Sequence, residues 1–595
     1  MSYFRYGMFF ALPPIGTLFA TLSGAAMNLR HMKNAPTVIL PVTPTHTDNY
    51  FLFFLVFIAT NAFKNVVAYT ICDGSPSGLF IGLDFAESFL CALIIFGGLA
   101  VAGKTLLFLL CYLAQGIFLL VHASYISLFN SPVHVGSFYR LLWELIPAME
   151  NQSAPLSFHL YFMTLIDLPL FLFFICRYGK IREHVQSRGN KPRFVFGAAL
   201  ILLISLVVAT ELMVFPKIDY FHPGKEVESA LIHRYGLLGF SIFDLLAKHT
   251  DNASQLLLSY GPETALAPIA KRPSGIVVIQ VESLDAGIVE FLWQGRYVTP
   301  FLHRLSQVSI YYPYLMSYHK AGGTSDCEVA VLNSVEPLDD FPTMKSDSYP
   351  YPHSMVTNLQ KKGFTAQAFH GNVGNFYNRD HAYFAMNFSS FYDQIRMGLV
   401  SEGWGASDEK VFAFAEEKIR SSSRPFFSYI ITMSSHEPFR NVDNYYADNR
   451  FEGVTPEMTR GYLKSMAYVD RMLELFIGKI RMENPDSYIY VFGDHTPYVL
   501  QKGPFKRTSL VMDDRNFEFV PLLILTPDHQ VRKETQNAVS FLDLAPTILS
   551  SAGVPGRINT YGENLLSPQL VNRIPLSGNY YDRKFLFESA QKIGH

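Results

Sequence analysis

Three residues that could bind a metal ion directly follow apolar, β-branched stretches of the chain. Glu282 comes at the end of "GIVVIQVES", and Asp494 and His495 come at the end of "SYIYVFGDH". Carboxylate oxygens combined with an imidazole nitrogen suit divalent cations such as Mn²⁺, Mg²⁺ or Zn²⁺. We therefore expect Glu282, Asp494 and His495 to hold one metal ion, with Mn²⁺ as the first choice.

The segment "GGTSDCE" places Thr324 after two glycines and before a predicted helix. One explanation is helix capping, because Ser325 and Glu328 have the spacing of a capping box. The other is catalysis. A cation beside Thr324 would lower the pKa of its hydroxyl, and the amides at the helix start would hold an anionic phosphate.

Four further residues could bind phosphate oxygens, and one of them could protonate a leaving group. They follow or lie near the predicted strands "GFTAQAFHGN" and "FFSYIITMSSH" and are His370, Tyr377, Arg379 and His436. A single residue of this kind at a strand end is more often a loop cap or a core hydrogen-bond partner. Their joint placement favours a functional site.

The elements that position these residues have an α/β pattern from Ser274 onward. Short apolar runs, including "FVPLLILTP", alternate with helical segments such as Asp408–Arg420 and Pro456–Ile480. This alternation predicts a mostly parallel sheet covered by helices on both sides, in which ligands collect beyond the carboxyl ends of the strands. We expect residues 274–595 to form the catalytic domain.

The preceding part of the chain predicts a multi-pass helical membrane domain over residues 1–215. Five apolar stretches are long enough to cross a hydrocarbon core of roughly 30 Å. A sixth candidate, Phe4–Met27, contains Pro13 and Pro14 and could be a span, a re-entrant segment or an uncleaved signal-like leader. The five stretches are Tyr50–Cys72, Leu79–Val101, Thr105–Asn130, Leu156–Cys176 and Phe194–Phe215.

The basic segment Arg177–Arg193 predicts the orientation, because basic loops remain in the cytoplasm. The chain after Phe215 would then lie outside the cytoplasmic (inner) membrane, on the extracytoplasmic or periplasmic side. Only Cys327 lies beyond the predicted spans, so this outer part can form no internal disulfide. The balance of 48 basic and 50 acidic side chains gives no indication of nucleic-acid binding.

Two features of this half had alternative explanations. Charged residues within the apolar stretches would either pair between helices or line a path for lipid headgroups. Residues 216–273 are a predicted linker with an amphipathic helix around Leu237–Leu246, which would lie on the bilayer or dock on the catalytic domain. The charged residues are Lys64, Asp84, Glu87, Asp167 and Glu211.

The motifs together resemble those of lipoteichoic acid synthases and related phosphoglycerol transferases, within the alkaline phosphatase and sulfatase superfamily. The resemblance extends from about Ser274 to Leu566 and ends with "FLDLAPTILSSAGVP". It is carried by motifs that occur in the family's order, namely "VIQVESLDA", "GGTSDCE", "FHGNVGNFYNRD", "SSHEPF" and "FGDHTP".

This resemblance implies an outer domain of the alkaline phosphatase type and a metal held by Glu282, Thr324, Asp494 and His495. Thr324 would be the covalent nucleophile. The headgroup would be held by the four phosphate-binding candidates named above. The chain departs from the family at Gly323, where lysine is frequent, at Tyr377, where tryptophan is frequent, and at Cys327, where the family has another small residue.

The expected function is transfer of glycerophosphate from phosphatidylglycerol to a hydroxyl of an envelope glycan, glycolipid or polymer. Three alternatives remain open. A phosphoethanolamine transferase would share the metal and threonine, but such enzymes usually have disulfides in the outer domain. A sulfatase-like hydrolase would need Cys327 in a C-x-P-x-R context, and "EVAV" follows it instead. A non-catalytic sensor or scaffold would be expected to lack a metal ligand.

Overall fold

The computed structural model describes most of the chain after residue 48. The described residues are 49–73, 78–102, 105–129, 166–187, 197–205, 260–267, 272–320, 322–338, 342–346, 349–497, 503–512, 515–567, 570 and 573–594. The chain separates into two compact units, Met1–Val56 and Phe57–His595. The described part of the first unit is the beginning of one helix, so the sheet and the site belong to the second.

Four helices of 20 to 25 residues make up most of the described chain before residue 188. They are α2 (Asn49–Asp73), α3 (Gly78–Ala102), α4 (Thr105–Phe129) and α7 (Leu168–Ser187), and residues 197–205 are also helical. Of the helices described, none combines the length and the apolar character that crossing a bilayer requires. Insertion of these helices into a membrane therefore stays a prediction.

The structure adds one correction to this half and leaves three expectations outside the described residues. α7 continues to Ser187, so the first part of the basic segment Arg177–Arg193 is helical rather than a loop. The sixth candidate stretch at Phe4–Met27, the amphipathic helix expected at Leu237–Leu246 and the charge at Glu211 lie outside the described residues.

A buried ion pair joins two of the charged residues in this helical part. Lys64 Nζ lies 3.1 Å from Asp167 Oδ1, and both side chains are almost fully buried. Asp167 also accepts hydrogen bonds from Tyr112 Oη at 2.7 Å and Asn61 Nδ2 at 2.8 Å. Asn61 and Gln115 exchange two hydrogen bonds of 2.9 Å. Pairing between charges, one of the two alternatives considered for these residues, is therefore present here.

A mixed sheet organises the α/β part of the chain. Its main strand order is β12-β5-β11-β9-β2-β8-β6-β7. The strands are β2 (Gly275–Val281), β5 (Ile310–Met316), β6 (Thr365–His370), β7 (Ser390–Tyr392), β8 (Phe426–Ile431), β9 (Tyr488–Gly493), β11 (Arg515–Leu525) and β12 (Arg532–Lys533). Two short strands, β10 (Ser509–Met512) and β13 (Val539–Ser540), add to β11 and β5.

The expectation of a mostly parallel sheet needs one correction, which concerns β11. β2, β6, β8 and β9 pair in parallel, but β11 runs antiparallel to both β5 and β9. The apolar run "FVPLLILTP" could not reveal this, because a strand buried on both faces has the same composition in either direction. The reversal brings the beginning of β11 to the edge where the parallel strands end.

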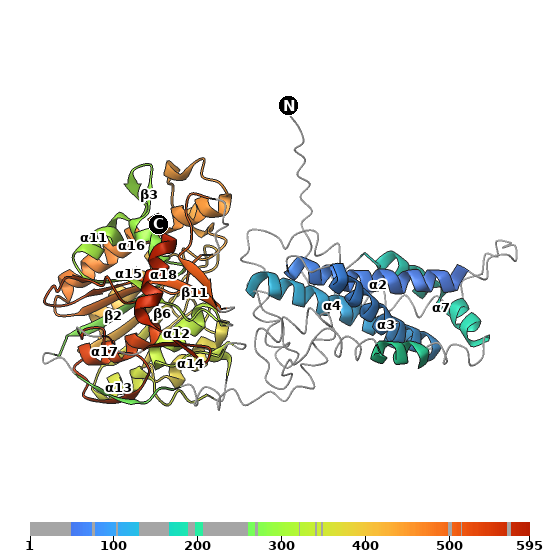
Figure 1. Cartoon of the computed structure of the whole chain (residues 1–595), viewed down its shortest axis with the longest axis horizontal. Coiled ribbons are helices and arrows are strands. Elements are labelled where there is room, and N and C mark those ends of the chain that lie inside the picture. Colours follow the sequence, from blue (N-terminus) through green and yellow to red (C-terminus); the bar gives the residue numbers. More distant parts are fainter. Residues whose placement is uncertain are drawn as a thin grey trace. The chain divides into compact units, whose positions relative to one another are not determined.

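Helices cover both faces of the sheet, as the alternating pattern predicted (Figure 1). One core contains buried residues of α12 (Thr324–Asn333), α13 (Met355–Lys361), α17 (Leu544–Ser551) and α18 (Arg583–Gly594). The other contains those of α11 (Pro300–Gln307), α15 (Asp408–Ser421) and α16 (Glu457–Glu483). Successive residues of β2 alternate between the two cores, as the pleat of a strand requires.

Candidate active site

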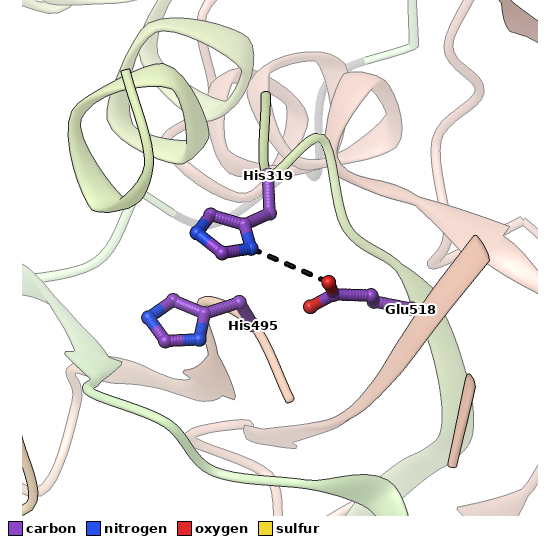
Figure 2. A group of neighbouring side chains, drawn as sticks. All are labelled: His319, His495 and Glu518. Carbon is purple, nitrogen blue, oxygen red and sulfur yellow. Dashed lines mark hydrogen bonds and ion pairs between the residues drawn. The ribbon is translucent and has the colours of Figure 1, made fainter. Parts of the chain in front are cut away.

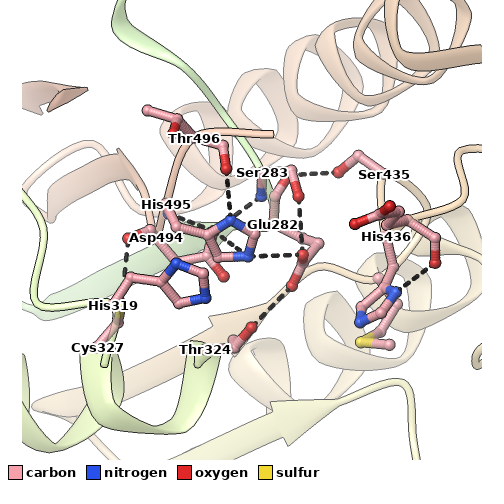
Figure 3. A network of polar contacts seen from close by, with 12 residues as sticks. Glu282, Ser283, His319, Thr324, Cys327, Ser435, His436, Asp494, His495 and Thr496 are labelled. Atoms are coloured by element: carbon pink, nitrogen blue, oxygen red, sulfur yellow. Dashed lines mark hydrogen bonds and ion pairs between the residues drawn. The ribbon is translucent and has the colours of Figure 1, made fainter. Parts of the chain in front are cut away.

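The two central strands deliver three potential ligands to one point. β2 and β9 are parallel neighbours in which Val281 pairs with Gly493, so the residues that follow them emerge side by side. His495 Nε2 lies 3.0 Å from Glu282 Oε1 and 3.7 Å from Asp494 Oδ1 (Figure 3). The ligand atoms of these three residues all lie within 4.8 Å of one another, and each residue is buried.

Thr324 is the first residue of α12 and points at this cluster. Its Oγ1 donates a hydrogen bond of 3.1 Å to Glu282 Oε2. Gly323 precedes it with φ 55° and ψ −131°, a conformation that a residue with a side chain rarely adopts. The amides of Ser325 and Asp326 donate to the carbonyls of Gly322 and Gly323 at 3.1 and 3.0 Å, so the expectation that amides at the helix start hold a phosphate stays a prediction.

The capping-box interpretation of this segment is wrong. Gly323 is the N-cap residue and makes no side-chain cap. Ser325 Oγ donates instead to the carbonyl of Gly322 at 2.7 Å. Glu328 is buried in an ion pair with Arg379, so its carboxylate does not turn back to the helix start. The glycines shape the turn that presents Thr324, and no side chain caps the helix.

The residues of this cluster fit a divalent cation. Asp494 Oδ1 accepts hydrogen bonds from the amides of Ser283 and His495, whereas the buried Oδ2 has no partner among the described residues. Burial and the nearby charge of Glu282 raise the pKa of Asp494 to about 8. Two carboxylates this close are ionised together only beside a compensating positive charge.

His495 has the orientation that a metal ligand needs. Its Nδ1 lies 2.9 Å from the carbonyl of Thr496, which can only accept a hydrogen bond, so Nδ1 carries a proton. Burial opposes protonation of the ring, but the charges of Asp494 and Glu282 raise the pKa of His495, so Nε2, 3.0 Å from Glu282 Oε1, also carries a proton; a cation held by these residues would replace that proton. Burial opposes ionisation of Glu282, but the positive charges of His495 and His436, with hydrogen bonds from His495 and Ser283, lower its pKa below the usual range.

Two residues that were not expected complete this side of the site. His319 stacks on His495, with ring centroids 4.2 Å apart, and its Nδ1 lies 3.3 Å from Glu518 Oε1 (Figure 2). Glu518 Oε2 accepts a hydrogen bond of 2.9 Å from the amide of Thr496. Burial opposes ionisation of Glu518, but His319 and His495 lower its pKa to about 2. His319 lies in the segment before Thr324, whereas Glu518 comes from the reversed strand β11.

Arg379, expected to bind phosphate, is buried and already paired. Its Nε and Nη2 donate to the Glu328 carboxylate at 2.6 to 3.1 Å, and Tyr383 Oη donates to the same carboxylate at 2.6 Å. Arg379 Nη1 lies 3.3 Å from the carbonyl of Phe376. Arg379 therefore contacts the segment that contains Tyr377 through the carbonyl of Phe376. Direct contact of Arg379 with phosphate stays a prediction.

His370 and His436 follow neighbouring parallel strands. His370 ends β6, and burial and the charge of Arg379 lower its pKa well below the usual range. Its buried Nδ1 has no partner among the described residues. His436 Nδ1 lies 2.7 Å from the carbonyl of Glu437, and the His436 ring packs on Trp404 with centroids 4.5 Å apart. Trp404 lies in a connecting loop without a recognisable motif.

Tyr377 lies close to the nucleophile turn. Its backbone has a positive φ of 56°, and its ring belongs to a small cluster with Phe376, Trp404 and Met433. The Tyr377 hydroxyl lies 3.7 Å from the position that a Cβ on residue 323 would take. The aromatic residue expected to hold the headgroup therefore stands next to the turn that presents Thr324.

Cys327 is buried one turn into α12. Its thiol donates a hydrogen bond of 3.2 Å to the Asp494 carbonyl, and its exposed fraction is zero. Burial and the charge of Asp494 raise its pKa well above that of an ordinary thiol. Cys327 therefore lies behind the ligand loop rather than at the position from which Thr324 faces the site.

Comparison with known proteins shows what the α/β part of the chain is similar to. Residues 274–554 match the family described as Sulfatase. Lipoteichoic acid synthase 2 of Bacillus subtilis is 25% identical over 454 residues, which cover 68% of this chain and 68% of that protein. The lipoteichoic acid synthase of Staphylococcus saprophyticus is 28% identical over 236 residues, covering 38% of this chain and 36% of that protein.

One solved structure shows the same fold, and a second was also compared. The lipooligosaccharide phosphoethanolamine transferase A (EptA) of Neisseria meningitidis aligns with a TM-score of 0.53 and 11% identity, covering 86% of this chain and 96% of that chain. The lipoteichoic acid synthase LtaP of Listeria monocytogenes is 20% identical, with a TM-score of 0.44, and 55% of this chain and 93% of that chain are covered.

Proposed function

We propose that this chain is a phosphoglycerol transferase of the lipoteichoic acid synthase type, because residues 274–554 match the family described as Sulfatase and lipoteichoic acid synthases are among the proteins similar to it. It would move glycerophosphate from phosphatidylglycerol to a hydroxyl of an envelope glycan, glycolipid or polymer. The observation that carries the proposal is the hydrogen bond of 3.1 Å from Thr324 Oγ1 to Glu282, beside the unpartnered Oδ2 of Asp494. A hydroxyl at a helix start beside a ligand cluster suits attack on phosphorus.

Glu282, Asp494, His495 and Thr324 would hold one divalent cation, for which Mn²⁺ is our first choice and Mg²⁺ and Zn²⁺ are alternatives. Such a cation lowers the pKa of a neighbouring hydroxyl and neutralises charge on phosphate oxygens. The His495 ring is oriented for this role by the Thr496 carbonyl, and Asp494 by the two amides on its Oδ1.

The transfer has two steps. Thr324 Oγ1 forms a bond to the phosphorus of the lipid, the bond from phosphorus to the diacylglycerol oxygen breaks, and the threonine proton leaves with diacylglycerol. The oxygen of an acceptor hydroxyl then forms a bond to the same phosphorus, the bond from phosphorus to Thr324 Oγ1 breaks, and the acceptor's proton restores the threonine hydroxyl. Tyr377, His370, Arg379 and His436 would surround the headgroup and its phosphate oxygens.

Phosphoethanolamine transfer is the alternative, because such an enzyme shares this fold. The two donors give different masses on Thr324. Incubation with phosphatidylglycerol and Mn²⁺, an acid quench and peptide mapping should find glycerophosphate on the Thr324 peptide. Thr324→Ala should remove the adduct and the release of diacylglycerol, whereas Thr365→Ala, at the beginning of β6, should change neither. A wild-type protein that turns over lipid with Thr324 unmodified would contradict the mechanism.

We also propose that the helices before residue 216 lie in the cytoplasmic membrane and that the α/β domain is extracytoplasmic. The positive segment Arg177–Arg193 supports this orientation. A reporter that works only outside the cytoplasm should be active when fused after His595 and inactive when inserted at Gln186. The opposite pattern would place the domain on the wrong side for an outer-leaflet lipid.

A further inference from the structure

A short β-hairpin before α11 lines a surface pocket that the proposed mechanism does not use. The hairpin consists of β3 (Leu292–Trp293) and β4 (Arg296–Tyr297). The pocket has a volume of about 260 Å³, and Arg450 and Phe451 of the 3-10 helix η7 (Asn449–Phe451) also line it. This volume is below the roughly 300–1,000 Å³ of pockets for drug-sized ligands, so one small unit such as a sugar ring suits this hairpin pocket.

The hairpin presents an aromatic ring and a guanidinium group side by side. Gln294 and Gly295 form its turn with positive φ angles of 52° and 75°, as a tight two-residue hairpin turn requires. Trp293 pairs directly with Arg296 across the two strands. Residues that are directly opposite each other have their side chains on the same face of the ladder, and both of these residues line the hairpin pocket.

The charge of the hairpin pocket comes from Arg296. Trp293 Nε1 donates a hydrogen bond of 2.9 Å to the carbonyl of Arg450, which fixes the indole ring. The Arg450 guanidinium donates from Nε and Nη2 to the Asp448 carboxylate at 2.6 to 3.0 Å, so its charge is balanced. Arg296 is exposed and forms no ion pair within the described part of the chain. The pocket therefore has one positive charge to offer to a ligand.

The two sides of the hairpin pocket both lead back to the candidate active site. β2 and β8 are parallel neighbours, so the segments that follow them leave the sheet at the same edge. The segment after β2 contains Glu282 and then the hairpin, whereas the segment after β8 contains His436 and then η7. The pocket is therefore formed by the continuations of two strands that end at the site.

A second pocket lies next to the first. It has a volume of about 280 Å³, shares Phe451 as a wall and is also lined by Phe439 and Arg440. The Phe439 amide donates a hydrogen bond of 3.0 Å to the carbonyl of His436. Arg440 is paired with Glu457 at 3.1 Å. The second pocket thus reaches the turn that begins at His436, and its paired charges suit hydroxyl groups better than an anion.

We propose that the hairpin pocket binds a sugar unit that carries a phosphate or a carboxylate and that belongs to the acceptor, an inference that rests on the proposed transfer reaction. The C–H groups of a sugar ring would pack on the negative face of the Trp293 indole. Arg296 would donate two parallel hydrogen bonds to the anionic group, for which a guanidinium fork has the right geometry. Neighbouring hydroxyls would occupy the second pocket, towards His436.

Calorimetry on the full chain in detergent tests the ligand class, with glucose 6-phosphate, glucuronate, glucose and inorganic phosphate as probes. Wild type should bind glucose 6-phosphate or glucuronate at least about tenfold more tightly than glucose or inorganic phosphate, and the preferred probe identifies the anion. Arg296→Gln should remove this preference, and Trp293→Leu should weaken binding of each sugar. The matched control is Arg304→Gln, which removes an exposed arginine of α11 that does not line the pocket and should leave binding unchanged.

Two results of the calorimetry would overturn the inference. One is wild-type affinities for glucose 6-phosphate, glucuronate and glucose that agree within about twofold. The other is a loss of affinity in Arg304→Gln as large as that in Arg296→Gln, because the effect would then not belong to the pocket. Unchanged melting temperatures identify the variants that are folded.

The acceptor role has a separate readout on the Thr324 adduct. The preferred probe should accelerate the loss of glycerophosphate from Thr324 in wild type, and Arg296→Gln should need about tenfold more of that probe for the same rate. An adduct whose lifetime the bound probe leaves unchanged would overturn the acceptor role. A wild-type chain that forms no adduct with phosphatidylglycerol would overturn the proposed function itself, and the calorimetry would still decide whether the pocket binds an anionic sugar.

Discussion

Replacing Asp494 by asparagine should remove most of the stabilisation by metal while leaving the metal-free protein folded. Both backbone amides that hold this side chain donate to Oδ1, at 2.7 and 2.8 Å, and Oδ2 has no partner in the described residues. The asparagine carbonyl can take the place of Oδ1, and its NH₂ then replaces the free oxygen. The variant loses one negative ligand and presents a donor to the cation, without losing a hydrogen bond.

The expected loss of stability follows from the coupling between metal binding and folding. A cation at about 100 times its dissociation constant stabilises the folded state by about 2.7 kcal/mol. Losing an outer-sphere partner weakens metal sites by about 10- to 100-fold, so losing a direct ligand should cost at least about 100-fold. The variant would then keep only about 0.4 kcal/mol of that stabilisation at the same concentration. For a large domain this difference is about 5 °C in melting temperature.

The assay is thermal unfolding of chelator-treated protein before and after Mn²⁺ is added. Asp285→Asn is the matched control, because Asp285 is an equally buried carboxylate three residues after Glu282. Its two oxygens both accept hydrogen bonds from backbone amides, those of Gly287 and Thr508. That variant should melt lower but keep the Mn²⁺ shift. A full Mn²⁺ shift in Asp494→Asn would refute the ligand assignment.

Two further predictions concern buried charges away from the ligands. Lys64→Met should destabilise the chain by about 3–5 kcal/mol, because it leaves Asp167 buried without its cation, and the double change Lys64→Met with Asp167→Leu should recover half or more. Melting of both variants in detergent tests this, and a double variant less stable than the single one would contradict it. Burial raises the pKa of Asp408 to about 6 from 3.8, so its ionisation opposes folding increasingly as pH rises from about 4 to 6. Asp408→Asn should therefore be as stable as wild type near pH 4 and more stable than wild type by up to about 3 kcal/mol above pH 6. A stability difference that decreases as pH rises would contradict this prediction.

The centre of the candidate site could be predicted from the sequence because the strands that carry it are parallel. Glu282, Asp494 and His370 each end or follow a buried run, and parallel strands bring such ends to one edge. The structure places Glu282 and Asp494 together with His495 as expected, although their roles as ligands stay a prediction. The candidate metal ligands could be predicted because they follow the ends of strands. In the sequence, the end of a buried strand is a change from apolar to polar residues.

Glu518 could not be found in this way. It lies near the beginning of β11, and a strand beginning reaches the site edge only because this strand is reversed. Its partner His319 does follow β5, within the segment first considered for Thr324. Neighbour order and strand direction depend on pairing between distant segments, which local composition does not encode.

The pairing of Glu328 also lay beyond the sequence pattern. The spacing of Ser325 and Glu328 is that of a capping box, but the energy of a buried, bidentate ion pair with Arg379 exceeds that of a cap. That partner lies 51 residues further along the chain. The capping box does not form because Glu328 pairs instead with Arg379, and a short segment of sequence cannot reveal that distant partner.

The position of Cys327 makes local opening of the site measurable. Its thiol is fully buried and is hydrogen-bonded to the carbonyl of Asp494, so a thiol reagent can reach it only when α12 and the loop that follows β9 separate. It is also the last cysteine in the sequence, because the other four all precede residue 177. The rate at which Cys327 is alkylated therefore reports how often the native site opens. A ligand that contacts both Thr324 and Asp494 should lower that rate.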